Sequence, residues 1–125
     1  KNINIKIGSK KTLITHGSPW KIDFYFYKNI DDKWKKKISK YNKELFILGH
    51  THHPMILKLI NKKKMVLNPG SVGQPRNGTS DACWMIIDDK NMRIDFMKTP
   101  YSTKKLINQI KKNDPDKKNL LKYFI

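Results

Sequence analysis

The chain has 125 residues, of which 38% are apolar, so it is long enough to bury one modest hydrophobic core. Its single cysteine, Cys83, cannot form an internal disulfide, which argues against a disulfide-stabilised secreted domain. No segment approaches the roughly 18 consecutive apolar residues of a membrane span, and no signal peptide is recognisable. These features are typical of a cytoplasmic protein without a membrane anchor, and we expect that location.

The formal net charge of +17 raises the question of nucleic-acid binding, because clustered basic residues attract polyanions. Of the 27 lysines and arginines only Arg76 and Arg93 are arginines, whereas specific recognition of bases and phosphates favours the arginine fork. The lysines are also spread along the chain instead of forming one stripe. We therefore expect no specific nucleic-acid binding, but a nonspecific attraction for anionic substrates.

The first part of the chain predicts two strands, a helical region and a buried strand, in that order. Strands at about 3–7 and 11–15 are joined as a hairpin by two turn residues, Gly8 and Ser9. A helical region follows from about residue 18 to 41, because apolar residues recur there at roughly helical spacing, with a break near 29–32. The apolar run 45–48 then predicts a buried strand.

The second part of the chain predicts two hairpins and a terminal helix. Strands of about 55–60 and 64–67 pair around Asn61 and Lys62, and strands of about 82–88 and 92–98 pair through residues 89–91. An amphipathic helix covers about 102–112 and ends at Asp114-Pro115-Asp116. The tail, 117–125, carries several apolar side chains, so we expect it to dock as a short helix.

Histidines follow two of these predicted strands. His50 and His52 stand two residues apart directly after the apolar run 45–48, and His16 follows the strand that ends near Thr15. Neutral imidazoles are the commonest protein ligands of divalent transition metals, and residues i and i+2 of a regular strand point to the same face. The pattern indicates a metal site, although histidines in loops with ordinary hydrogen bonds would fit the spacing too. By the same alternation His53 points elsewhere, either as a structural residue or as a residue that supports the metal ligands.

The neighbouring residues resemble a known family. Thr15-His16-Gly17, Leu48-Gly49-His50-Thr51-His52-His53-Pro54 and Asn68-Pro69-Gly70-Ser71-Val72-Gly73-Gln74-Pro75-Arg76 follow one another in the order found in the C-terminal half of calcineurin-like metallophosphoesterases, most similarly in small bacterial and archaeal phosphodiesterases. The resemblance implies half of an α/β fold in which two packed β-sheets form a sandwich flanked by helices (αββα). Residues 1–101 would form the C-terminal part of that domain, and residues 102–125 its terminal helix and basic tail.

The resemblance also implies a dinuclear metal centre. His16 and His50 would bind one ion and His52 the other, with Mn²⁺ preferred and Zn²⁺, Fe²⁺, Ni²⁺ or Mg²⁺ as alternatives. The family supplies further ligands and the proton donor from Asp-x-His, Gly-Asp and Gly-Asn-His segments, none of which occurs here. No catalytic residue is therefore expected in this chain, and three neutral imidazoles provide no anionic bridge between two cations. We interpret the chain as a fragment or split half that needs a missing N-terminal half or an equivalent chain.

Three further residues are candidates for substrate binding. By resemblance Asn68 and Ser71 lie in a loop that lines the phosphate site, although Asn68-Pro69-Gly70-Ser71 also fits a plain β-turn. Arg76 is the one arginine near this loop, so it is a candidate for a bidentate phosphate contact, with packing across a subunit contact in a homo-oligomer as the alternative.

The resulting functional hypothesis is a phosphodiesterase or phosphatase that hydrolyses its substrate by attack of a metal-activated hydroxide. The isolated chain would be inactive. The alternative is a noncatalytic interaction module, similar to the phosphoesterase-like subunit of retromer. Because half a sandwich leaves one inner sheet face uncovered, we also expect Ile14, Leu45, Ile47 and Leu67 to present apolar side chains without internal cover, beside the histidines.

Overall fold

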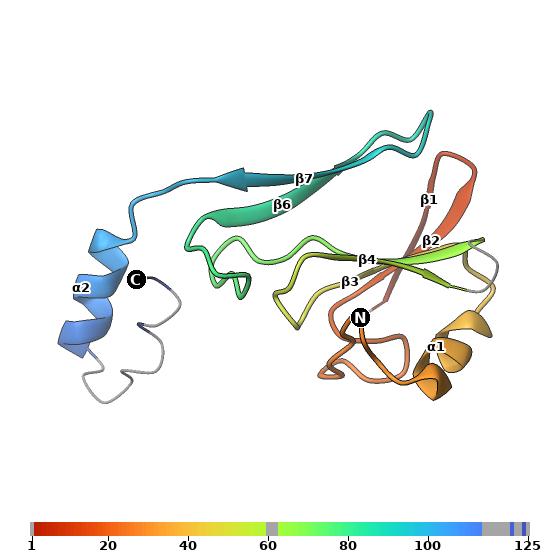
Figure 1. The fold of residues 1–125 in the computed structure, drawn as a ribbon, viewed down its shortest axis with the longest axis horizontal. Coiled ribbons are helices and arrows are strands. Elements are labelled where there is room, and N and C mark those ends of the chain that lie inside the picture. The colour runs from red at the N-terminus through yellow and green to blue at the C-terminus, as the bar shows by residue number, and fades with distance from the viewer. Residues whose placement is uncertain (1, 60–62, 114–120, 122–123, 125) are drawn as a thin grey trace.

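The computed structural model describes residues 2–59, 63–113, 121 and 124. Seven strands and two helices occur there, in the order β1 (Ile3–Ile7), β2 (Lys10–Thr15), α1 (Asp32–Ser39), β3 (Leu45–Leu48), β4 (Met55–Leu59), β5 (Lys64–Asn68), β6 (Ala82–Ile87), β7 (Ile94–Thr99) and α2 (Lys104–Asn113). Strands β1 to β5 form one sheet, and β6 and β7 form a separate hairpin that crosses above it (Figure 1). None of the helices described is long and apolar enough to cross a membrane.

The five-stranded sheet has the order β1-β2-β3-β5-β4 and is parallel at its centre. Strand β3 runs parallel to both of its neighbours, with Ile14 opposite Ile47 on one side and Leu67 opposite Ile47 on the other. The outer strands β1 and β4 pair antiparallel with β2 and β5. The carboxyl ends of β2, β3 and β5 therefore lie at one edge of the sheet, where open α/β sheets commonly bind ligands.

One face of this sheet is covered by α1 and by the connection 16–31, which places the hydrophobic core there (Figure 1). Phe46 and Val66 from the sheet pack with Ile38 of α1, and all three side chains are fully buried. Lys64 on β5 holds the end of the helix, because its Nζ donates 2.7 Å hydrogen bonds to the carbonyl oxygens of Ser39 and Tyr41.

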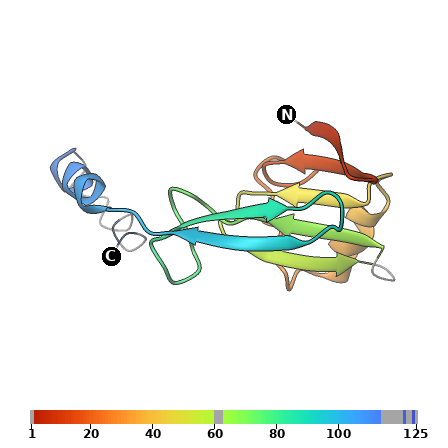
Figure 2. The same cartoon turned by 90° about the horizontal axis from the view of Figure 1, so that it is seen from above.

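The opposite face of the sheet is only partly covered. Viewed from above, the β6–β7 hairpin lies over β3, β5 and β4 and leaves β1 uncovered (Figure 2). Ile3 and Ile5 on β1 are 52% and 40% exposed, respectively. The prediction of apolar residues without internal cover is correct only in part for Ile14 and Ile47, which are half-buried, and wrong for Leu45 and Leu67, which are fully buried. Ile14 and Ile47 line a cavity that reaches His16, whereas Leu67 lies on β5 beneath the hairpin.

The predicted helix over 18–41 is wrong for most of its length, since only Asp32–Ser39 is helical. Ser18 sets up a tight turn instead: its hydroxyl accepts a bond from the amide of Lys21 and donates one to the Lys21 carbonyl oxygen, both at 3.0 Å. A Cβ on Gly17 would lie 2.2 Å from the carbonyl oxygen of Ile22, so glycine is needed for this close approach. The segment that follows continues to α1 without helical or strand structure.

The other predicted elements are confirmed, with ends shifted by up to about two residues. The β1–β2, β4–β5 and β6–β7 pairs are antiparallel hairpins, as expected, and α2 takes the place of the helix predicted at 102–112. The helix end at 114–116 lies outside the described residues, as does most of the tail. In the tail, Phe124 is buried and its carbonyl oxygen accepts a 3.1 Å bond from Thr103 Oγ1. The division at residue 101 stays a prediction.

Candidate metal site

The predicted metal-binding histidines lie at the carboxyl edge of the sheet. His16 follows β2 directly, and His50 and His52 lie in the connection between β3 and β4. Because β2 and β3 are parallel, with Thr15 opposite Leu48, the residues after them emerge side by side. The amide of Gly49 donates a 2.7 Å hydrogen bond to the carbonyl oxygen of His16, which holds the two strand ends together.

His16 and His50 meet at this edge. Nδ1 of His50 lies 3.0 Å from Nε2 of His16, and the ring centroids are 4.9 Å apart with an interplanar angle of 72°. Two nitrogens bound to one ion at about 2.1 Å and at right angles would be separated by about 3 Å. The pair therefore has the spacing of two ligands of one ion, and without an ion one ring donates a hydrogen bond to the other.

The connection that carries His50 and His52 is not a continuation of β3. Both residues have left-handed backbones, with φ of 63° and 60°, and Thr51 N donates 2.7 Å to the carbonyl oxygen of Gly49 across a three-residue turn. Left-handed φ values are uncommon outside glycine and cost free energy, so the surrounding structure must hold them. The expectation that strand alternation aims both imidazoles is wrong, because β3 ends at Leu48.

His52 is oriented by a different contact. Its Nδ1 donates a 2.8 Å hydrogen bond to the carbonyl oxygen of Gln74, and its own carbonyl oxygen accepts from the amide of Arg76 at 3.3 Å. A backbone carbonyl on Nδ1 fixes the tautomer in which Nε2 is the unprotonated nitrogen, an arrangement common in metal-binding histidines. The loop after β5 thereby holds His52 in a form that suits a metal ligand.

Asn68 supports the histidine connection from inside the protein. The side chain is fully buried, and its Nδ2 donates to the Gly49 carbonyl oxygen at 2.8 Å and to Thr51 Oγ1 at 2.9 Å. Its Oδ1 accepts from the amide of Gly70 at 2.9 Å. Three internal partners tie the turns after β3 and β5 together. Asn68 is thus seen here as a positioning residue, and its contact with substrate stays a prediction.

The environment of His50 favours a neutral ring. Burial lowers its pKa, the nearby His16 lowers it further, and His52 acts in the same direction, while Asp23 opposes them. Nε2 of His50 is buried and makes no hydrogen bond of good geometry to the described residues. A neutral imidazole is the form that accepts a metal ion, and Nδ1 is the nitrogen of His50 that faces His16.

The residues present therefore fit a metal ion in part. His16 and His50 converge and His52 is held in a suitable tautomer, but within residues 2–59, 63–113, 121 and 124 no three His, Cys, Asp or Glu side chains gather closely enough to hold an ion. The three-ligand site stays a prediction. Imidazoles alone also leave two cations without an anionic ligand, so a complete dinuclear site needs carboxylates from elsewhere.

The two remaining candidates for substrate binding, Ser71 and Arg76, lie in the loop after β5. Ser71 is half-buried, with its hydroxyl accepting a 2.9 Å bond from Gln74 N and its carbonyl oxygen accepting from Cys83 N. These bonds hold the loop that orients His52. Arg76 is half-buried too, and its amide reaches the backbone of His52, which places it next to the histidine connection. Phosphate contacts by these two residues stay predictions.

The region that was predicted to be a helix contains an aromatic segment, residues 24–27, which lies beside His50. Tyr25 packs on His50 with ring centroids 4.2 Å apart, and Tyr27 stacks on Tyr25 at 6.0 Å. Phe26 between them is buried, so the chain alternates as an extended segment. The signal in the sequence was the period of two in Phe24-Tyr25-Phe26-Tyr27, which favours an extended backbone over a helix.

Comparison with known proteins identifies the family. The sequence profile of the calcineurin-like phosphoesterase superfamily domain matches residues 1–91. This superfamily comprises phosphoesterases that typically bind divalent metals. The family resemblance expected from the histidine and Asn-Pro-Gly-Ser segments is thereby confirmed.

The chain is also similar to three longer proteins. It is 31% identical to the uncharacterized protein MJ0912 of Methanocaldococcus jannaschii, with 89% of this chain and 50% of that protein aligned. The fold is shared with the hypothetical protein PH1004 of Pyrococcus horikoshii OT3, at 19% identity and a TM-score of 0.77, over 97% of this chain and 48% of that protein. It is also shared with a metallophosphoesterase from Sphaerobacter thermophilus, at 21% identity and a TM-score of 0.72, over 97% of this chain and 56% of that protein. The expected fold class is confirmed, and the chain spans about half the length of these relatives.

Proposed function

Because this chain belongs to the calcineurin-like phosphoesterase superfamily, we propose that it contributes part of a dinuclear metal site to a phosphodiesterase or phosphatase. The observation that carries the proposal is the 3.0 Å approach of the His16 and His50 ring nitrogens at the carboxyl edge of the sheet. In the proposed site these two residues hold one divalent ion, and His52 holds the second. Mn²⁺ is our preferred ion, with Zn²⁺, Fe²⁺, Ni²⁺ and Mg²⁺ as alternatives.

The chain's own residues supply orientation and neutral ligands. Asn68 and Gln74 hold the histidine connection through hydrogen bonds, which limits the rearrangement that the imidazoles need to accept an ion. Bound divalent ions supply Lewis acidity and activate a water molecule for attack on phosphorus. Arg76 and Ser71 are proposed to contact the phosphate oxygens, on which negative charge develops during hydrolysis.

The partner that completes the site is a polypeptide segment with carboxylates, either joined to this chain or separate. The relatives are about twice as long as the aligned region, which supports such a segment. The partly covered sheet face next to His16 offers a surface for it. We propose that the 125 residues alone have little or no hydrolytic activity, since no carboxylate completes the histidine site among the described residues.

The first test is metal binding. The double variant His50→Ala, His52→Ala should bind Mn²⁺ or Zn²⁺ at least about tenfold more weakly by calorimetry, since lost ligands are not replaced. Its urea midpoint should change little if the ion serves catalysis and not folding. His53→Ala is the matched control for metal affinity, because it removes the neighbouring histidine. Unchanged metal affinity in the double variant would remove the basis of the proposal.

The second test is hydrolysis of a chromogenic phosphodiester with Mn²⁺. The chain alone should be nearly inactive, and mixing it with the separately produced half of the Methanocaldococcus jannaschii relative that this chain does not match should restore turnover if the halves associate. Strong activity from the 125 residues alone, lost in His52→Ala, would show that no complementing segment is needed.

A noncatalytic interaction module is the second candidate. It is favoured by the lack of a converged three-ligand site within the described part of the chain. Such a module would bind a partner without hydrolysing phosphoesters, and would keep that binding after the double histidine substitution. If the double histidine variant still associates with the complementing half but no longer restores hydrolysis, the catalytic role is identified instead.

A further inference from the structure

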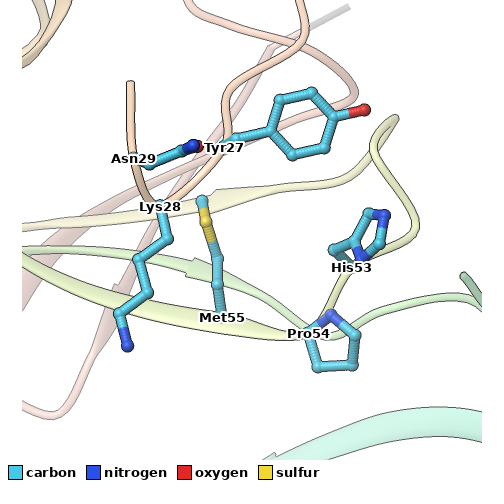
Figure 3. Close-up of a pocket in the computed structure, with 6 residues that line it drawn as sticks. All are labelled: Tyr27, Lys28, Asn29, His53, Pro54 and Met55. Atoms are coloured by element: carbon cyan, nitrogen blue, oxygen red, sulfur yellow. The ribbon is translucent and has the colours of Figure 1, made fainter. Parts of the chain in front are cut away.

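A second concave site lies beside the histidine connection, on the α1 side of the sheet. A cavity of about 360 Å³ is lined by Tyr27, Lys28, Asn29, His53, Pro54 and Met55 (Figure 3). Its size falls within the range of small-molecule sites in proteins. Two chain segments build it: the extended aromatic segment before α1, and the residues that connect His52 to β4.

A continuous series of ring contacts links this cavity to the metal-binding pair. Tyr25 packs on His50 at 4.2 Å, Tyr27 stacks on Tyr25 at 6.0 Å with an interplanar angle of 10°, and His53 meets Tyr27 edge-on at 5.7 Å. The cavity is thus two ring contacts away from His50. With the phosphate at the histidines, as in the proposed function, this cavity is a neighbouring site for the organic group of the substrate.

The walls of the cavity suit a flat, apolar group with polar edges. Figure 3 shows the Tyr27 ring on one side and Met55 and Pro54 on the other, with His53 at the end. Aromatic rings and a thioether offer stacking and dispersion contacts to a planar ring system. Lys28 and Asn29, both exposed, lie at the rim, where an amine and an amide can bond to ring nitrogens or carbonyls.

From these contacts we propose that the cavity binds the planar aromatic group of a phosphoester substrate, and that a nucleobase is the group it takes. The position of the phosphate in this inference rests on the proposed function, whereas the binding of the aromatic ring does not. Tyr27 is the residue that supplies the stacking face. Base stacking on an aromatic side chain accounts for roughly a tenfold gain in affinity or more.

The test compares two phosphoesters that differ only in the base. Adenosine 5′-monophosphate and ribose 5-phosphate are titrated into the 125-residue chain by calorimetry, in a buffer with chelator so that no metal contributes. We expect the nucleotide to bind at least about tenfold more tightly. Tyr27→Ala should abolish the difference, and Tyr27→Phe should keep it because the ring remains. Tyr101→Ala, an exposed tyrosine before α2, is the matched control and should bind like the unchanged chain.

The outcomes separate this inference from the proposed function. Equal affinity for the two phosphoesters, or a preference that survives Tyr27→Ala, overturns the nucleobase site even if metal binding and complemented hydrolysis succeed. A preference that depends on Tyr27, in a chain that neither binds metal nor gains activity on complementation, supports the site and refutes the catalytic proposal. An aliphatic phosphoester that binds as tightly as the nucleotide also overturns the inference.

Discussion

The two faces of the five-stranded sheet differ in how completely they are covered. On the α1 side, Phe46 and Val66 are fully buried among aliphatic and aromatic residues from α1 and the connection before it. On the hairpin side, Ile3 and Ile5 are exposed, and a cavity of about 310 Å³ opens along Ile14 and Ile47 to His16. Both faces are rich in apolar residues, so their burial differs because different elements cover them and not because their composition differs.

The difference bears on how the residues of the proposed metal site are held. Asn68 and Thr51, which hold the histidine connection, are fully buried. The exposed ring of His16, in contrast, borders the open cavity. The chain thus holds the histidine connection from the packed side, while His16 borders the uncovered side. A complementing segment would add both apolar cover and charged ligands on that side.

The largest expected effect is loss of a core side chain from the packed face. Phe46→Ala should reduce the free energy of unfolding by about 3–5 kcal/mol, because a buried aromatic ring is replaced by a cavity. Ile5→Ala on the open face should cost at most about 1 kcal/mol. Urea unfolding of both variants measures the contrast, and equal losses would mean that the two faces are packed alike.

A smaller effect is expected at the boundary between the faces. Asn68→Ala should cost about 2–3 kcal/mol in unfolding free energy, because Gly49 O, Thr51 Oγ1 and Gly70 N lose their buried partner. The histidine NMR signals should shift as the connection loosens. Asn108→Ala on the exposed side of α2 is the control and should stay within about 0.5 kcal/mol. Unshifted histidine signals in Asn68→Ala would show that another contact holds the connection.

The smallest effect on stability, with a clear effect on surface properties, is expected on the open face itself. The unchanged chain should bind a hydrophobic dye or self-associate, and the double variant Ile3→Ser, Ile5→Ser should lower dye fluorescence by about half or more. Ile22→Ser is the control, since Ile22 is 59% exposed but lies in the connection before α1 and not on the sheet. A monodisperse chain that binds no dye would contradict an open apolar face and favour a self-sufficient module.

Most elements of the fold could be predicted because their signals are local. The apolar run 45–48 and the three hairpins follow from strand periods and turn residues, and the structure confirms them. The pairing of His16 with His50 follows from two histidines placed after strands that prove to be adjacent and parallel. The connection 18–31 was mispredicted because packing of its aromatic residues against the sheet, together with the Ser18 turn, outweighed an apparent helical spacing.

The sequence by itself determined the family, the order of the strands along the chain and the residues that reach the carboxyl edge of the sheet, because these depend on motifs and local periodicity. The tertiary structure alone decided three other properties. It buried Asn68 as a support, turned His50 and His52 through left-handed backbones, and placed Tyr27 over a cavity. Each of these depends on contacts between segments far apart in the chain, which local patterns do not encode.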